Sequence, residues 1–260
     1  MKGLITRTIS GFMIVLLTIA ITIKGGMSLS YFTMALSILG LREFYNAMNE
    51  IKIEPIKYIG YLSCIGILLN PLEIKWAHLR LIFFIAMVVI SFIRLFFKKD
   101  ITPVDILITF LGILYIPFLL RHIIYLDGNI YIWLIYINAW GTDTFAYIFG
   151  TLFGKNKLCP RISPNKTIEG SLGGIFGAVL LSLGFARYFS LSHLWKLVLL
   201  AITGGIIAQL GDLTASRIKR VTGIKDFGFI MPGHGGILDR FDSILFTAPF
   251  VYYYTSFFLL

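Results

Sequence analysis

Long apolar runs recur along the whole chain, and they constrain its fold more than any other feature. A helix of about 20 apolar residues crosses the hydrocarbon core of a bilayer and satisfies its own backbone hydrogen bonds there. Nine such segments are predicted near residues 8–23, 27–45, 56–70, 79–97, 104–120, 130–149, 168–190, 195–213 and 239–260. The sequence therefore predicts an all-α integral membrane protein, a polytopic helical bundle with about nine transmembrane helices.

The composition agrees with this fold class. Of the 260 residues, 57% are hydrophobic and 14% are charged, which leaves too few polar side chains to cover a soluble globule of this size. The net charge is +10, and basic loops facing anionic headgroups are the ordinary source of such a charge in a membrane protein. Membrane lipids are therefore the expected surroundings, nucleic acid is not an expected partner, and a homodimer is left open.

Basic residues in the short loops predict how the chain is oriented. Lys and Arg are frequent in the loops on the side of the N-terminus, as at Lys52, Lys98 and Lys155, and they are sparse on the other side. Cytoplasmic loops carry the excess of Lys and Arg, so the N-terminus is predicted inside and, after nine spans, the C-terminus outside. The chain is thus expected in the cytoplasmic (inner) membrane.

Polar residues divide this single transmembrane domain into two parts. Residues 1–129 are plain apolar spans with short loops, in which Glu43 and Asp105 are interpreted as structural carboxylates near helix ends. In residues 130–260, polar and glycine-rich segments enter the spans themselves. The first part is therefore predicted to be a scaffold and the second a catalytic half.

Asp143 lies in the middle of a predicted span. A carboxylate at that depth costs roughly 2.5 to 3.5 kcal/mol on insertion scales unless water, a cation or a metal receives it. We expect Asp143 to face a polar cavity. The competing interpretation is a structural carboxylate that is hydrogen-bonded to a neighbouring helix.

The end of the eighth span combines oxygen ligands with positive charge. Asp212 closes this span, and Ser216 follows four residues later, which places both on one helical face. Lys219 and Arg220 come one turn further on. This face is a candidate for binding a metal ion and phosphate groups together.

Two more aspartates, Asp239 and Asp242, are three residues apart at the start of the ninth span and share a helical face. With Asp212 they are expected at the cytosolic mouth of one cavity, where converging carboxylates need a cation. Hard oxygen ligands suit Mg²⁺, which normally bridges a bound polyphosphate. A proton relay in a transporter is the competing use of such carboxylates.

A glycine-rich loop precedes the ninth span, with His234 at its centre and Lys225 upstream. Its glycines are Gly233, Gly235 and Gly236. Glycine lets backbone amides approach a ligand closely, and such amide concavities hold phosphate. The loop is therefore a candidate phosphate site, although a plain helix-linking turn is the simpler interpretation.

A second polar loop, "SPNKTIEGSLGG", opens the seventh span. Ser163 and Lys166 are candidates for holding phosphate, and Thr167 is expected to cap the helix that follows. Four glycines then run down that helix at close-packing spacing, namely Gly170, Gly173, Gly174 and Gly177. We expect these glycines to be structural.

Residues 216–242, "SRIKRVTGIKDFGFIMPGHGGILDRFD", carry a long pattern of fixed spacing. It resembles the defining motif of the phosphatidate cytidylyltransferase family, also called CDP-diacylglycerol synthase: S-x-x-K-R, four residues, K-D-x-G, three residues, then P-G-H-G-G-x-x-D-R-x-D. Every fixed position is met. The segments "DTFAY", "SPNKTIEGSLGG" and "GDL" resemble other blocks of the same family, so the resemblance covers mainly residues 130–260.

The resemblance implies that CTP and phosphatidic acid give CDP-diacylglycerol and pyrophosphate, with Mg²⁺ as cofactor and the active site at the cytosolic face. It assigns catalytic roles to Asp212, Asp239, Lys219, Arg220 and His234. It assigns substrate binding to Lys166, Ser163, Ser216, Lys225, Gly233, Gly235, Gly236 and Asp143. It assigns metal binding to Asp212, Asp239 and Asp242. The basic residues are not divided between CTP and the lipid phosphate, and His234 either donates to a phosphate or only stabilises its loop.

Two other functions compete with this one. A CTP-dependent lipid alcohol kinase would transfer the γ-phosphate to a neutral hydroxyl, which requires a base that only the carboxylates could supply. An ion-coupled transporter would use the intramembrane aspartates as an ion path. The transporter is disfavoured because the basic and glycine-rich residues collect on one predicted side rather than at the midplane.

Overall fold

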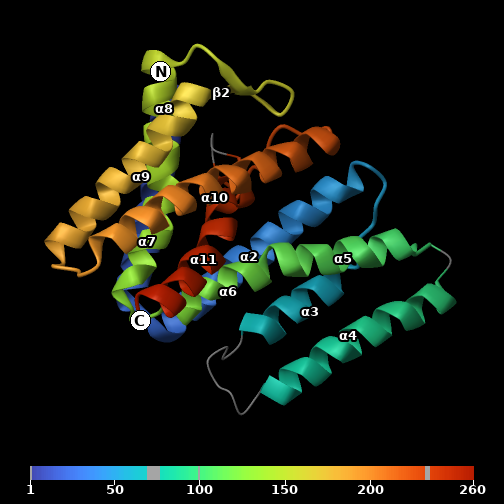
Figure 1. The fold of residues 1–260 in the computed structure, drawn as a ribbon. Helices are drawn as coiled ribbons and strands as arrows, with labels where there is room; N and C mark the ends of the chain where they lie inside the picture. Colours follow the sequence, from blue (N-terminus) through green and yellow to red (C-terminus); the bar gives the residue numbers. More distant parts are fainter. Residues whose placement is uncertain (1, 69–76, 99, 232–234) are drawn as a thin grey trace. The chain divides into compact units, whose positions relative to one another are not determined.

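The computed structural model describes residues 2–68, 77–98, 100–231 and 235–260, and these residues are mostly helical (Figure 1). The helical elements are α1 (Lys2–Lys24), α2 (Gly26–Asn49), α3 (Lys57–Leu68), α4 (Ala77–Phe97), α5 (Pro103–Tyr115), α6 (Pro117–Tyr125), η2 (Ile130–Ile132), α7 (Trp133–Tyr136), η3 (Ile137–Gly141), α8 (Thr142–Phe153), α9 (Ile168–Tyr188), α10 (Leu194–Val221) and α11 (Leu238–Phe258). Within the described residues, each predicted apolar segment coincides with one helix or with a run of consecutive helices. The predicted helical fold class is thus confirmed.

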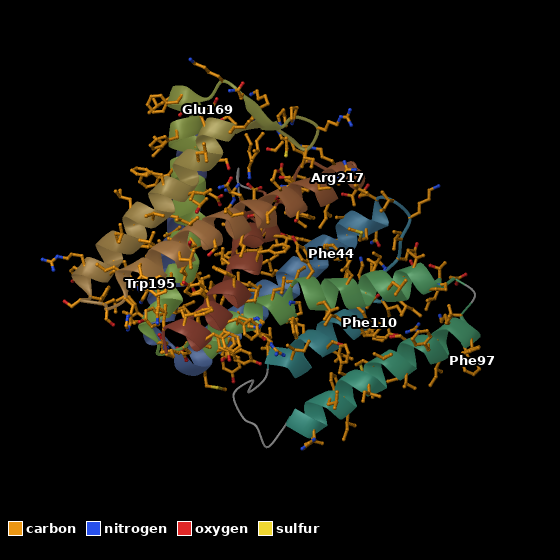
Figure 2. All side chains as sticks on the ribbon, viewed as in Figure 1. Phe44, Phe97, Phe110, Glu169, Trp195 and Arg217 are labelled. Atoms are coloured by element: carbon orange, nitrogen blue, oxygen red, sulfur yellow. The ribbon has the colours of Figure 1, made fainter. Side chains whose placement is uncertain are left out.

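Three stretches among the described residues are long and apolar enough to cross a membrane, namely Pro103–Tyr125, Ile168–Tyr188 and Leu194–Val221. Several shorter helices are also apolar, and α4 carries large apolar side chains on its surface. Phe97, at the end of α4, is 84% exposed (Figure 2). Apolar surface on this scale suits a lipid environment, so the chain associates with a membrane.

The chain forms two compact units, and each combines segments that are distant in the sequence. Unit 1 consists of residues 1–127 and 221–240, and unit 2 consists of residues 128–220 and 241–260. The last residue of α10 and the first turn of α11 therefore belong to unit 1, whereas the remainder of both helices belongs to unit 2.

In unit 1, α2 packs against α3, α5 and α6 around the buried side chain of Tyr45. The Tyr45 hydroxyl donates to the carbonyl of Thr109 at 2.8 Å, which satisfies its polar atom away from water. Gly60 and Gly112 lie against the ring, where a Cβ on Gly112 would come within 2.5 Å of Tyr45 Cε1. Small residues thus let these helices close around one aromatic side chain.

The contacts of Asp105 confirm that it is a structural carboxylate near a helix end. It forms a capping box with Thr102 at the start of α5, and it accepts a 2.6 Å hydrogen bond from the amide of Glu54. The buried carboxylate therefore accepts from the Thr102 amide at the start of the helix and also from a segment outside it.

In unit 2, α8 and α9 lie side by side along their length (Figure 1). Gly173 and Gly177 of α9 face Phe149 and Phe145 of α8 so closely that a Cβ at either glycine would overlap the facing ring. The expected structural role of the glycines in this helix is therefore confirmed, because small residues allow the two backbones to approach.

This packing predicts that Gly177→Ala destabilises the protein. The added methyl group would collide with Phe145, and overpacking of this kind costs about 1–3 kcal/mol. Gly184→Ala in the same helix is the matched control, because a Cβ there meets nothing within 4 Å and Ala favours a helix over Gly by about 0.5–1 kcal/mol. Thermal unfolding in detergent should show a lower Tm for the first variant only; equal Tm values would contradict this packing.

A short antiparallel hairpin replaces the loop that was expected before α9. Strand β1 (Lys157–Cys159) pairs with β2 (Ser163–Thr167), with Lys157 opposite Thr167 and Cys159 opposite Ser163. Thr167 then caps α9 by accepting from the amide of Gly170 at 3.1 Å, as predicted.

Glu169 closes the base of this hairpin (Figure 2). Its carboxylate accepts from the amides of Lys155 at 3.1 Å and Asn156 at 3.2 Å. The alternation that usually marks a strand is absent from this short polar segment, which is why the sequence did not predict it.

Candidate functional site

Asp212 and Lys166 form an ion pair that joins α10 to strand β2 within unit 2. Their side chains are 24% and 25% exposed, so the pair is partly shielded from water. Ser216 donates to Asp212 Oδ1 at 3.3 Å, which confirms that these two residues share a helical face. The predicted span ends near Asp212, and α10 continues beyond it to Val221. Asp212 therefore lies inside a helix, with its carboxylate directed at the hairpin.

A second group of contacts joins α8 to α11 in the same unit. The Ser243 hydroxyl donates to Asp143 Oδ2 at 3.1 Å, and the Ser243 amide donates to Asp242 Oδ1 at 2.7 Å. Gly211 lies against this part of α11, where a Cβ would come within 2.7 Å of the Asp242 carbonyl oxygen. Asp143 is thus hydrogen-bonded to a neighbouring helix, as the competing interpretation of this residue requires.

The two groups interact electrostatically. The Asp242 side chain is 7% exposed and feels the charges of Asp212 and Asp143, which repel it, and of Lys219, which attracts it. Three carboxylates from α8, α10 and α11 are thereby opposed by the ammonium groups of Lys166 and Lys219. A cation bound here would relieve the repulsion between these carboxylates.

The geometry limits what kind of metal site this cluster can be. Among the residues that the structure describes, no three His, Cys, Asp or Glu side chains are grouped closely enough to hold one ion between them. Mg²⁺ does not need such a cage, because it is usually bound through one or two carboxylates, waters and substrate phosphates. The carboxylate and hydroxyl oxygens of Asp212, Asp242 and Ser216 fit that mode of binding.

A basic residue of α10 contacts the hairpin that carries Lys166. Arg220 Nε donates to the Ile162 carbonyl oxygen at 3.2 Å, which ties the end of α10 to the residue before Ser163. Part of the Arg220 guanidinium thus holds the hairpin in place. Ser163 and Lys166 both lie on β2, and the structure therefore brings these two candidates and Arg220 to the same hairpin.

The remaining candidates belong to unit 1. Lys225 is exposed, and Gly235 has a φ of 85°, a left-handed conformation that favours glycine. Asp239 Oδ2 accepts from the amides of Phe227 at 2.8 Å and Gly236 at 2.9 Å. These contacts make Asp239 an organiser of the segment that leads into α11. Gly233 and His234 lie outside the described residues.

Two polar residues that the sequence did not single out as functional make buried hydrogen bonds in the structure. Ser243, which is 1% exposed, links Asp143 to α11. Glu43 is 3% exposed and, contrary to expectation, lies well inside α2 rather than at its end. A signal for Glu43 was present, because an ionisable residue within an apolar span is a functional candidate by default.

Comparisons with known proteins extend over nearly the whole chain. Residues 5–258 match the model of the cytidylyltransferase family. A Staphylococcus epidermidis protein named phosphatidate cytidylyltransferase is 39% identical over 251 residues, which cover 94% of this chain and 95% of that protein. Proteins of the same name from Staphylococcus saprophyticus and Staphylococcus aureus are 39% and 34% identical, each again over 94% of this chain and 95% of the relative. The likeness thus includes both units.

Proposed function

The chain belongs to the cytidylyltransferase family, and from this premise we propose that it transfers CMP from CTP to phosphatidic acid. The products are CDP-diacylglycerol, an intermediate from which phospholipids are made, and pyrophosphate. One structural observation supports the proposal most directly: acidic residues of three helices gather in unit 2 beside basic residues of the hairpin and α10. A reaction between two phosphate compounds needs this combination of charges.

The chemistry of the substrates explains what the protein must supply. An oxygen of the lipid phosphate attacks the α-phosphorus of CTP, and the bond from that phosphorus to the bridging oxygen of pyrophosphate breaks. A phosphate monoester has a second pKa of about 6, so the attacking oxygen is already anionic at pH 7 and needs no strong general base. Catalysis therefore consists mainly of positioning the two substrates and neutralising charge.

Residues of unit 2 are assigned to these tasks. Lys166, Lys219 and Arg220 attract phosphate oxygens and neutralise charge on the leaving pyrophosphate. Ser163 and Ser216 can donate hydrogen bonds to the same groups. Lys225, Gly235 and Gly236 in unit 1 are assigned to substrate phosphate on the sequence motif, as are Gly233 and His234; the Gly236 amide donates to Asp239 in this structure.

Asp212 and Asp242 are the proposed ligands of Mg²⁺, with Asp143 supporting the negative charge of the cluster. The assignment of Asp239 as a further ligand rests on the motif alone. When bound, Mg²⁺ supplies positive charge to the α- and β-phosphates of CTP. Asp212 would hold the cation in place of Lys166, and the Lys166 ammonium would then be available to a phosphate.

We further propose that the chain crosses the inner membrane nine times, with the N-terminus inside and the site at the cytosolic face. The loop that contains the hairpin supports this orientation, because residues 154–166 include Lys155, Lys157, Arg161 and Lys166 and contain no acidic residue. CTP is a cytosolic nucleotide, so the proposed orientation also gives the site access to its substrate.

The decisive experiment supplies CTP to sealed membrane vesicles that contain the protein and phosphatidic acid. With Mg²⁺ present, inverted vesicles should convert cytosine-labelled CTP into labelled CDP-diacylglycerol, whereas right-side-out vesicles should make product only after permeabilisation. Chelation of divalent cations should abolish turnover in both. Equal activity in the two sealed preparations would contradict the proposed cytosolic site.

A second label separates the reaction from its nearest competitor. CTP labelled at the γ-phosphate should release its label in pyrophosphate and leave the lipid unlabelled. Label transferred to a lipid alcohol would identify a kinase instead. Magnesium-dependent ion flux without any lipid product would favour the transporter.

A further inference from the structure

The carboxylate of Glu43 holds the start of α11 from a position far away in the sequence. Its Oε1 accepts from the amide of Ile237 at 2.9 Å, and its Oε2 accepts from the amide of Leu238 at 2.8 Å. These amides belong to the N-terminus of a helix, where the first N–H groups have no intrahelical partner. A carboxylate from α2 thus acts as the cap of α11 within unit 1.

Glycines leave the space that the Glu43 carboxylate occupies. A Cβ on Gly228 would lie 2.6 Å from Glu43 Oε1, and one on Gly236 would overlap the same carboxylate. One turn earlier on α2, Gly40 faces Leu238, since a Cβ there would lie 3.8 Å from Leu238 Cδ1. The two glycines of the motif segment therefore admit a buried acid, and α2 and the start of α11 are packed together.

Asp239 completes this arrangement from the other side. Its Oδ2 accepts from the amides of Phe227 and Gly236, so Glu43 and Asp239 together bind four backbone amides of residues 227–238. The two carboxylates also repel each other electrostatically. Asp239 accepts from the amide of Gly236, and Glu43 accepts from the two amides that follow it, those of Ile237 and Leu238. The orientation of Asp239 thus depends on a segment that Glu43 holds.

The free-energy cost of burying a carboxylate implies that the contact between Glu43 and these amides is strong. A charge that is 97% removed from solvent is expensive unless hydrogen bonds and favourable dipoles receive it, and Glu43 is 3% exposed. Amides at a helix N-terminus provide both, because their bonds to a carboxylate are charge-assisted and the helix dipole is positive there. Loss of the carboxylate would leave the buried amides of Ile237 and Leu238 without an acceptor.

We propose that Glu43 is a positioning residue for the reaction: its carboxylate fixes Ile237 and Leu238 at the start of α11 and thereby the direction in which Asp239 is presented. This inference rests on the proposed function, because the motif gives Asp239 its role. It also assigns a part in catalysis to the segment of the chain that the sequence had suggested to be scaffold only.

The test compares Glu43→Gln with Asp105→Asn, a matched control in the same unit. Asp105 is also a buried carboxylate that caps a helix and accepts from a distant backbone amide, but it lies on α5 and contacts Glu54 and Thr102 instead. Gly228→Ala is the second variant, because it keeps the acid and presses a methyl group against Glu43 Oε1. It keeps the inference testable if Glu43→Gln fails to fold.

Amide hydrogen exchange gives a readout that does not depend on activity. Glu43→Gln and Gly228→Ala should speed exchange in peptides that cover residues 235–241, whereas Asp105→Asn should speed it near residues 54 and 102–106. Kinetics per folded molecule should then show kcat reduced about 10- to 100-fold by Glu43→Gln, the size expected from a small misplacement of a reacting group. The half-saturating Mg²⁺ concentration should also rise, and Asp105→Asn should leave both quantities near those of the natural chain.

Two results would overturn the inference. One is unchanged exchange at residues 235–241 in both Glu43→Gln and Gly228→Ala. The other is a kcat and Mg²⁺ dependence for Glu43→Gln that match those of Asp105→Asn, which would make the acid merely structural. A natural chain that forms no CDP-diacylglycerol would instead refute the proposed function, so the two failures are distinguishable.

Discussion

Asp212→Asn is expected to lower kcat/KM for CTP on the order of 10³-fold, which corresponds to about 4 kcal/mol of transition-state stabilisation. The asparagine keeps an oxygen that can accept from Ser216, but it lacks the charge that a cation requires. Loss of the partly exposed ion pair with Lys166 should cost at most about 1 kcal/mol of stability. The catalytic effect should therefore far exceed the structural one.

The measurement is product formation per folded molecule, together with Tm in detergent. Glu50→Gln is the control, because it removes one negative charge from an exposed position at the end of α2. It should retain the activity of the natural chain. If Asp212→Asn kept more than about a tenth of the natural kcat/KM, the residue would lie outside the range expected of an essential electrostatic group.

Lys166→Met should reduce kcat/KM about 10²-fold, which is typical for the loss of one group that stabilises charge in a transition state. Methionine preserves much of the length of the side chain while removing its ammonium group. Lys166→Arg should recover part of the loss, because it restores the charge with a different geometry. The variant series thus separates charge from packing at the end of β2.

Lys157→Met supplies the matched control on the neighbouring strand. Lys157 lies in the same hairpin, opposite Thr167, and is exposed. A general attraction of the basic hairpin for anionic lipid would make both substitutions equally harmful, and the effect would fall with added salt. A direct role for Lys166 requires that its replacement alone be severe, and comparable losses in the two variants would count against that role.

Most of the helical segments could be predicted because bilayer thickness fixes the length of an apolar span. The segments 27–45 and 168–190, for example, correspond to α2 (Gly26–Asn49) and α9 (Ile168–Tyr188). Their ends were less predictable, as at α10, where the polar and basic residues after Asp212 remain helical to Val221. Membrane hydropathy marks where lipid ends, whereas a helix can continue into the aqueous phase.

The candidate site was only partly visible in the sequence. Spacing of four residues correctly placed Ser216 on the face of Asp212, because neighbours on a helix follow from its pitch. No comparable rule relates Lys166 to Asp212 or Ser243 to Asp143, since these residues are far apart along the chain. Such contacts depend on how hairpin and helices pack.

The sequence by itself determined the helical class, the membrane association and the family, because periodicity, hydropathy and a motif of fixed spacing are local properties of the chain. Tertiary structure alone decided that the amides of Ile237 and Leu238 are held by Glu43, a residue 194 positions away from Ile237. A buried charge needs hydrogen-bond donors, and these come from whichever segments the fold brings close. The spacing of residues along the chain does not specify those segments.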